Sequence, residues 1–260
     1  MTQRFPAGCT LAALLALPLA ASAQELPSAE RYHVRAEWRW WKPGLDSQIQ
    51  KGFGTAQGTE LDLASDLGVP DEDTWEVHGA IKLKPSFKLL GAYIPIEYRG
   101  DTIAQSNFYY GGEQIFRGDR VVSTFKGNLY GAAFEWDFVR RPSGYLGLIV
   151  GGRVLLVDSV VLSPEPARRV VDSETFPLPV FGLTGRAYAG RRLSLSGSFA
   201  GLTLGSRGHY WEFDVATRFH ISNRFAGQVG WRRIAIEGQD NRDFVKFIMG
   251  GITFGVEVSL

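Results

Sequence analysis

Residues 244–260, at the C-terminal end of the chain, alternate between apolar side chains and small or polar ones. This period of two predicts a β-strand with one apolar face. A terminal strand of this kind would expose an apolar stripe and unpaired backbone groups, whereas in a closed barrel it pairs with the first strand. The pattern therefore predicts the closing strand of a barrel that lies in a lipid bilayer. Its apolar positions are Ile248, Ile252, Phe254, Val256, Val258 and Leu260.

The same alternation recurs upstream, and turn-forming residues separate its segments. The connections alternate between long and tight, as outer loops and periplasmic turns do in barrels. This predicts an all-β fold, a closed antiparallel transmembrane β-barrel of ten strands, with eight as the alternative if one weak hairpin lies outside the wall. A change of phase at Arg232 and Arg233 predicts a bulge in the ninth strand. The nine strands before the closing one are expected at residues 32–41, 75–84, 87–99, 122–138, 145–157, 176–190, 193–204, 209–221 and 225–237.

One face of nearly every predicted strand is free of charge, and we expect that face to meet lipid. A Lys or Arg on it would cost about 2–4 kcal/mol at mid-bilayer. The charged alternates must then point inward, where both signs occur and pair, because an unpaired buried ion is costly. This predicts a largely plugged lumen. Its expected charges are Arg35, Glu37, Arg39, Glu76, Lys82, Glu97, Glu135, Arg153, Arg186, Glu212, Asp214, Arg218 and Glu257.

In the third predicted strand the same reasoning turns an apolar face outward, made of Leu90, Ala92, Ile94, Ile96 and Tyr98. Aromatic side chains near strand ends suit the two interfacial girdles of such barrels. The predicted girdle residues are Trp40, Trp75, Tyr98, Trp136, Phe138, Trp211 and Phe225.

The N-terminus has the features of a cleaved export signal. Arg4 supplies a positive charge, residues 11–21 form a short apolar core, and a small-x-small site predicts cleavage between Ala23 and Gln24. Cys9 is the single cysteine of the chain, so the mature protein, residues 24–260, has none. Disulfides, thiolate metal sites and cysteine nucleophiles are thereby excluded. We expect residues 24–260 to form one barrel domain.

Composition agrees with a barrel. The 28 basic and 27 acidic residues balance, so no field of one sign exists to attract nucleic acid. A spanning helix needs about 20 apolar residues. The best such stretch, residues 145–162, is interrupted by Arg153 and Asp158. A closed sheet is the other way to satisfy every backbone group in lipid.

The chain resembles the small OmpA-like and OmpW-like proteins of the outer-membrane β-barrel group. The signal that ends in Ala23, the alternating strands and the segment 58–68 carry this resemblance. It implies a bacterial outer-membrane location, contact with outer-membrane lipid and lipopolysaccharide, and insertion by the barrel assembly machinery. It implies no cofactor. The chain departs from many such barrels at Leu260, where they end in Phe or Trp.

One catalytic constellation can be assembled. Residues 219–223 resemble the His-x-Ser-Asn motif of the lipid A deacylases, which would make Ser222 the nucleophile, His220 the base and Glu237 the group that orients it. However, Ser222 and Asn223 also suit a tight turn, and Glu237 would lie about a strand length away.

Two further clusters of polar residues have the composition of a site. Asp101, Asp119, His209 and Asp240 would lie near the outer rim, as the catalytic residues of the ten-stranded omptin proteases do, but their spacing singles out no pair. Acidic residues between 62 and 73 have the chemistry of a hard-cation site and lack the spacing of a calcium loop.

Three functions remain open from the sequence. We favour a non-enzymatic barrel with a structural or surface-interaction role. The alternatives are a narrow porin-like channel for small solutes and a deacylase-like hydrolase. The oligomeric state is left open.

Overall fold

The computed structural model describes residues 30–54, 57–164, 167–203, 205, 208–240 and 243–260. The predicted signal peptide, residues 1–23, and its cleavage site between Ala23 and Gln24 lie outside these ranges. Within them, no helix is long and apolar enough to cross a membrane.

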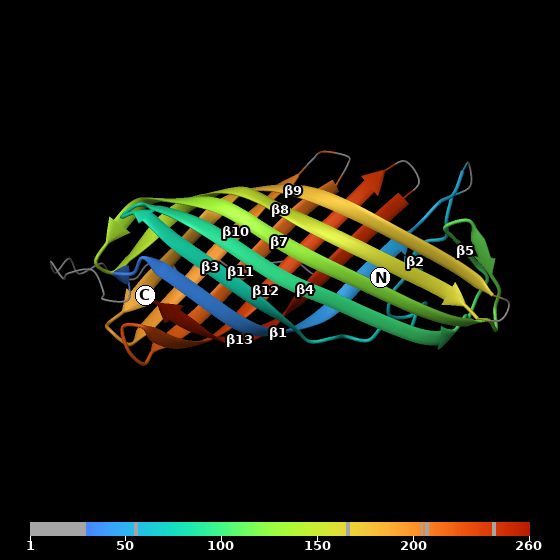
Figure 1. Ribbon diagram of the computed structural model, residues 1–260, viewed down its shortest axis with the longest axis horizontal. Coiled ribbons are helices and arrows are strands. Elements are labelled where there is room, and N and C mark those ends of the chain that lie inside the picture. Colours follow the sequence, from blue (N-terminus) through green and yellow to red (C-terminus); the bar gives the residue numbers. More distant parts are fainter. Residues whose placement is uncertain (1–29, 55–56, 165–166, 204, 206–207, 241–242) are drawn as a thin grey trace, which may run out of the picture.

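Ten long antiparallel strands form one closed barrel (Figure 1). Each pairs with the next barrel strand along the chain, and the last pairs with the first, from Arg35 opposite Ser259 to Gln50 opposite Phe244. The predicted closed ten-stranded barrel is therefore confirmed. Its strands are β1 (Val34–Gln50), β3 (Thr74–Lys84), β4 (Phe87–Ile103), β7 (Arg120–Arg141), β8 (Gly144–Ser163), β9 (Arg168–Ala189), β10 (Leu193–Thr203), β11 (Gly208–His220), β12 (Phe225–Asp240) and β13 (Asp243–Ser259).

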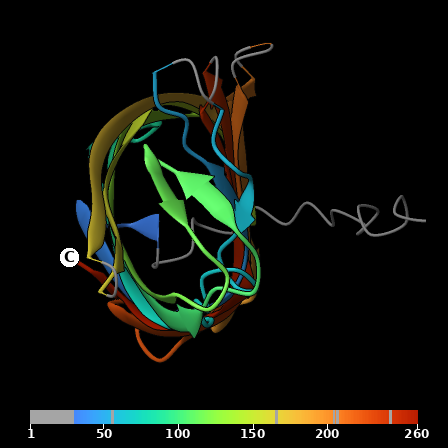
Figure 2. The ribbon, with the colours of Figure 1, turned by 90° about the vertical axis from the view of Figure 1, so that its right-hand side faces the viewer.

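The two ends of the barrel differ. At the tight-turn end, which holds the start of β1 and the C-terminus, the connections are residues 85–86, 142–143, 190–192 and 221–224. At the loop end, the connections 51–73 and 104–119 contain three short strands: β2 (Leu61–Asp62), β5 (Phe108–Tyr110) and β6 (Glu113–Ile115). Figure 2 shows the β5–β6 hairpin lying across the mouth of the barrel at the loop end.

Exposure alternates along the barrel strands as the period-two pattern requires. In β11, for example, Asp214 and Arg218 point inward and are buried, whereas Phe213 and Phe219 point outward and are exposed. The outer surface carries many large exposed apolar side chains, which include Trp38, Phe134, Val150, Leu183, Phe199, Val229 and Phe254.

The predicted orientation of β4 was wrong. Its outer face instead carries Leu89 and Tyr93, and Tyr93 packs there against Trp75 and Tyr130. Because β4 is apolar on both faces, a period of two could not decide which face meets lipid. The side chains predicted to face lipid instead follow the inward positions of β4. They are Leu90, Ala92, Ile94, Ile96 and Tyr98.

The predicted bulge in β12 was also wrong. Pairing to β11 and to β13 runs without a break through Arg232 and Arg233. Arg232, Ile234 and Ile236 all point inward and are buried. The change of phase in the sequence marks the height at which the interior turns from charged to apolar. The register shifts that the structure does contain lie at residues 82–84 and 137–139.

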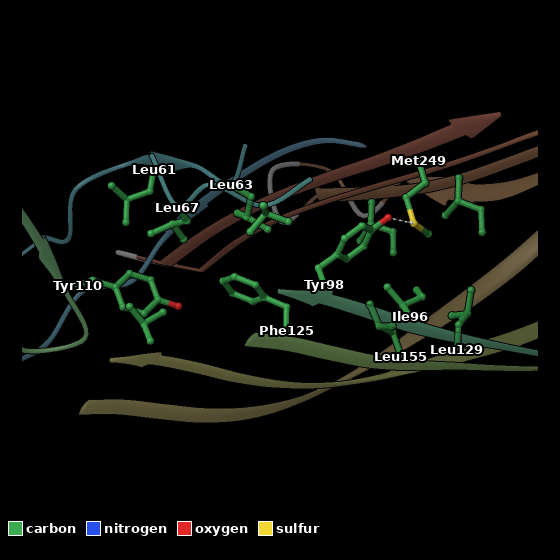
Figure 3. Packing of buried hydrophobic residues seen from close by; sticks show 14 of the residues in the cluster. Leu61, Leu63, Leu67, Ile96, Tyr98, Tyr110, Phe125, Leu129, Leu155 and Met249 are labelled. Carbon is green, nitrogen blue, oxygen red and sulfur yellow. Dashed lines mark hydrogen bonds between the residues drawn. The ribbon is translucent and has the colours of Figure 1, made fainter. Parts of the chain in front are cut away.

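Buried apolar side chains form a cluster inside the barrel toward the loop end (Figure 3). Inward side chains of the wall, such as Phe125 and Leu155, meet the segment 61–69, which folds into the mouth. Backbone hydrogen bonds from Leu63 N to Ser47 O and from Val69 N to Leu63 O fix that segment. Figure 3 also shows the hydroxyl of Tyr98 donating to the sulfur of Met249, at 3.3 Å.

The wall is lower on one side. β10 pairs with β9 only along residues 181–189, so among the described residues the stretch 168–180 of β9 has no partner on its β10 side. We call this gap above the β10–β11 hairpin the notch. Pro177 and Pro179 lie on its edge, and proline has no N–H to leave unpaired there.

Candidate functional site: a charged floor and an apolar chamber

The lumen near the tight-turn end is crossed by a layer of ion pairs, which we call the floor. Every barrel strand contributes to it, since even β10 supplies Ser196, which accepts a hydrogen bond from Arg218. The floor contains eight basic and eight acidic side chains. They are Arg35, Arg39, Lys82, Lys88, Arg153, Arg186, Arg218 and Arg232 with Glu30, Glu37, Glu76, Glu135, Asp137, Glu212, Asp214 and Glu257.

Arg39 of β1 lies at the centre of this layer. Its Nη2 is 2.7 Å from Glu37 Oε2, and its Nη1 is 2.6 Å from Asp214 Oδ2 on β11 and 3.3 Å from Glu76 Oε1 on β3. Arg232 of β12 then joins Glu76 to Glu212, which also holds Arg153 of β8 at 2.5 Å. Three carboxylates around one guanidinium satisfy most of its five donors.

Glu257 of β13 is a second centre. It lies 2.8 Å from Arg186 Nη2, 2.9 Å from Arg218 Nε and 3.5 Å from Arg35 Nε. Near the tight-turn end, Lys88 Nζ holds Glu135 at 2.6 Å and Asp137 at 3.0 Å. Because removing an ion from water costs several kcal/mol, such a layer is tolerated only when its charges pair and balance, as they do here.

Twelve of the thirteen predicted lumen charges lie in the floor, and the prediction for Glu97 was wrong. Glu97 points outward from β4, where its side chain is 48% exposed and pairs with Arg99 and Lys126. The cause is the inverted orientation of β4. That inversion and the supposed bulge also concealed two floor residues, Lys88 and Arg232, while Asp137 and Glu30 were overlooked although both lie near predicted strand ends.

Above the floor, toward the loop end, lies a cavity of about 790 Å³, which we call the chamber. Tyr210 stands at the boundary, because it lines the chamber and its hydroxyl donates to Glu212 of the floor. The deep walls of the chamber are apolar. They are formed by inward side chains of the barrel strands and of the mouth segment, including Leu63, Ile96, Phe125, Leu155, Tyr210, Ile236 and Phe247.

The predicted aromatic girdle is outward-facing at six of its seven positions. Tyr98 is the exception, because it is 2% exposed and points into the apolar cluster. The other six, Trp40, Trp75, Trp136, Phe138, Trp211 and Phe225, follow the outward positions of their strands.

The three catalytic candidates are not assembled. Ser222 lies in the turn between β11 and β12, and its hydroxyl accepts hydrogen bonds from the backbone N–H groups of Arg224 and Phe225. His220 Nε2 is 2.9 Å from Ser194 Oγ, whereas Glu237 pairs across the strands with His209 at the loop end. Eleven residues of strand, about 36 Å at 3.3 Å each, separate the positions of His220 and Glu237.

Three of the four rim candidates, Asp101, Asp119 and His209, form other pairs, and the side chain of Asp240 lies outside the described part of the chain. Asp101 binds Arg120, Asp119 binds Arg168, and His209 Nε2 lies 3.8 Å from Glu237. In the acidic run, Asp62 and Asp71 accept hydrogen bonds from backbone N–H groups of their own loop and of β1. Among the described residues, no group of three or more His, Cys, Asp or Glu side chains is placed to hold a metal ion.

A closed barrel with an apolar outer surface and an ion-paired interior belongs to the class of integral outer-membrane β-barrels. No family model and no curated protein matches the chain. Among solved structures it is similar to the outer membrane protease OmpT from Escherichia coli, at 10% identity and a TM-score of 0.59, over 87% of this chain and 96% of that one.

It is also similar to the translocator domain of the autotransporter NalP from Neisseria meningitidis, at 11% identity and a TM-score of 0.49, over 88% of each chain. Ail of Yersinia pestis matches at 10% identity and a TM-score of 0.36, over 86% of this chain and 99% of that one. At 10% identity, the similarity to OmpT shows a shared fold alone.

Proposed function

We propose that this protein is a non-enzymatic outer-membrane barrel that does not conduct ions and that presents its loop end as an interaction surface. The observation that carries the proposal is the floor. Its sixteen charges come from nine of the ten barrel strands and from Glu30 just before β1, and many are nearly inaccessible, such as Glu76 at 0% and Glu257 at 2% exposure. A hydrated ion would have to separate several of these pairs at once to pass.

The two alternative functions have weaker support. A narrow channel would need a continuous wet path, and the pairing of Arg39 with Glu37, Glu76 and Asp214 across the lumen argues against one. A deacylase-like hydrolase would need Ser222, His220 and Glu237 together, and Glu237 lies at the opposite end of the barrel from Ser222 and His220. OmpT is named as a protease, and that activity is a property of OmpT that we do not extend to this chain.

The partners that we propose follow from the outer surface and the topology. The exposed apolar side chains fit the acyl chains of outer-membrane lipid and lipopolysaccharide. The exposed side chains of β13, the last strand, and of Leu260 fit recognition by the barrel assembly machinery during insertion.

Single-channel recording in planar bilayers tests the proposal. The wild-type barrel, shown to be folded by heat-modifiable gel migration, is expected to be silent. The variant Glu37→Ser/Arg218→Ser removes one buried ion pair from the floor without changing net charge, and it is expected to conduct in discrete steps. The matched control Glu97→Ser/Lys126→Ser removes an ion pair from the outer surface and should stay silent. Discrete conductance of the wild type would contradict the proposal.

A further inference from the structure

The chamber has the size and lining of a ligand site. Its volume of about 790 Å³ lies within the roughly 300–1,000 Å³ of small-molecule pockets. Deep in it, Ile236, Leu155 and Ile96 are no more than 7% exposed. The floor closes it toward the tight-turn end, and the mouth segment and the β5–β6 hairpin cover it toward the loop end.

The chamber opens sideways, through the notch. Leu202 and Glu174 both occupy inward positions of their strands and line the chamber, yet both remain exposed. They flank the place where β10 ends and β9 continues alone. Inward-facing residues are exposed here because no strand of the described residues covers them on the β10 side, so this side of the wall gives access to the chamber.

The notch is continuous with the lipid-facing surface. Phe181 is the residue nearest the loop end at which β9 pairs with β10, and its side chain points outward and is 56% exposed. Just below the notch, Phe199 and Trp211 stack on the outer face with ring centroids 5.1 Å apart. Longer loops mark the extracellular side of outer-membrane barrels, so the notch adjoins the outer leaflet.

The charge of the opening restricts what can enter. The chamber lining includes four carboxylates, Asp172, Glu174, Glu237 and Asp243, against the ammonium group of Lys51. Lys126 also lines the chamber, but its ammonium group pairs with Glu97 on the outer surface. Lys51 is already held by three of these carboxylates, at 2.9–3.1 Å. Among the described residues of the lining, an anionic headgroup would therefore meet an excess of negative charge and no unpaired cation.

We infer that the chamber binds an uncharged hydrocarbon chain that enters from the outer leaflet through the notch. Two sources share this chemistry: a free apolar molecule dissolved in the membrane, and the acyl chain of a membrane lipid. The inference goes beyond the proposed function and does not depend on whether the floor conducts.

Photolabelling in proteoliposomes tests it. The probe is a dodecane that carries a mid-chain diazirine, and adducts are mapped by mass spectrometry. Lipid-facing residues such as Phe181 and Leu156 should be labelled in any case and serve as an internal standard. Labelling of the inward-facing Ile236, Leu155 and Phe176 is the expected result. Absence of these inward adducts, in a folded barrel whose outer face is labelled, would overturn the inference.

A pair of variants distinguishes a probe bound inside the chamber from a probe that contacts the outer surface of the barrel. Val157→Trp/Leu178→Trp narrows the chamber from two adjacent strands, and about a tenfold loss of inward adducts is expected. Leu156→Trp/Leu183→Trp places the same ring volume on the outer face of the same strands and should leave the inward adducts unchanged. Equal inward labelling in both variants would contradict binding inside the chamber.

Two further probes identify the source and test the charge. A phosphatidylcholine with the diazirine on its acyl chain should give inward adducts if lipid chains enter; inward adducts from dodecane alone would identify free apolar molecules. The carboxylate form of dodecanoic acid bearing the same diazirine should label the inward residues less, and Asp172→Asn/Glu174→Gln should restore its labelling. Stronger inward labelling by the carboxylate than by dodecane would overturn the assignment to an uncharged chain.

Discussion

Arg186 and Glu257 form a two-point ion pair across the lumen, from β9 to β13, although 71 residues separate them in the sequence. The Nη1–Oε1 and Nη2–Oε2 distances are 3.2 and 2.8 Å, and neither side chain is more than 3% exposed. Such planar, two-bond pairs combine geometric specificity with charge. This contact ties opposite parts of the wall together at the height of the floor.

Glu257→Gln should therefore destabilise the barrel strongly. The amide keeps the shape of the carboxylate but leaves Arg186, Arg218 and Arg35 short of one negative charge in a buried layer. Removing one partner of a buried pair costs about 3–5 kcal/mol. Urea unfolding in detergent, followed by tryptophan fluorescence, measures the loss. Asp101→Asn, which breaks a half-exposed pair with Arg120, should leave the midpoint nearly unchanged; an equal effect of the two would contradict a special role for the floor.

Gly100→Ala should loosen the mouth segment. A Cβ at Gly100 would lie 2.6 Å from Ser123 Oγ and closer still to the carbonyl oxygen of Leu67. Overpacking of this kind costs about 1–3 kcal/mol. Hydrogen exchange of the Val69 amide, which donates to Leu63 O, should accelerate. Gly91→Ala on the same strand meets open space and serves as the control. Unchanged exchange in Gly100→Ala would mean that the segment is not packed against β4.

Ser222 should be unreactive as a nucleophile. Its hydroxyl accepts two backbone N–H groups in the turn, and His220 is engaged with Ser194 instead. A fluorophosphonate probe should leave the folded protein unlabelled, and Ser222→Ala should lose no hydrolytic activity. Labelling that disappears in Ser222→Ala would revive the hydrolase alternative.

Lys51 should hold the rim of the chamber together between β9 and β13. Partial burial lowers the pKa of Lys51, but hydrogen bonds to Asp172, Glu174 and Asp243 outweigh it, so the net shift is upward. A raised folded-state pKa gives stability that is complete below the ordinary lysine pKa of about 10.4 and is lost only above it.

The amide of Gly52, which donates to Asp243 Oδ1, reports on this contact. Its intrinsic-rate-corrected hydrogen exchange should be flat between about pH 7 and 9 in the wild type. In Lys51→Met it should be faster throughout that range. Protection that the variant retains would show that the three carboxylates do not depend on Lys51 for their arrangement.

The strands of the barrel could be predicted from the sequence because each β-strand in lipid has an apolar face toward the lipid and a more polar face toward the lumen. β11 shows this best: Glu212, Asp214 and Arg218 alternate with large apolar residues, and each falls on the predicted side. The pairing of β1 with β13 also followed, since a terminal apolar strand needs a partner.

The chamber could not be predicted, because alternation does not show which face of a strand points inward when both faces are apolar. Ile94 and Ile96 of β4 are predicted to face lipid for this reason. In β12 the change of phase predicted at Arg232 and Arg233 is the point where the buried inward side chains become apolar, at Ile234 and Ile236. The sequence contains the information only when β4 and β12 are taken together, because both strands lose their polar face at the same height above the floor. Only the register between strands shows that these heights agree.

Thiol accessibility tests the division of the lumen most directly. In a protein with Cys9→Ser, a cysteine at Ile236 lies in the chamber, where the native side chain is 6% exposed, and a cysteine at Gln239 lies at its exposed rim. A neutral alkyl methanethiosulfonate should modify both positions, whereas a charged sulfonate reagent should modify Gln239→Cys alone. Equal modification of Ile236→Cys by the charged reagent would show a water-filled lumen and would contradict an apolar chamber above a closed floor.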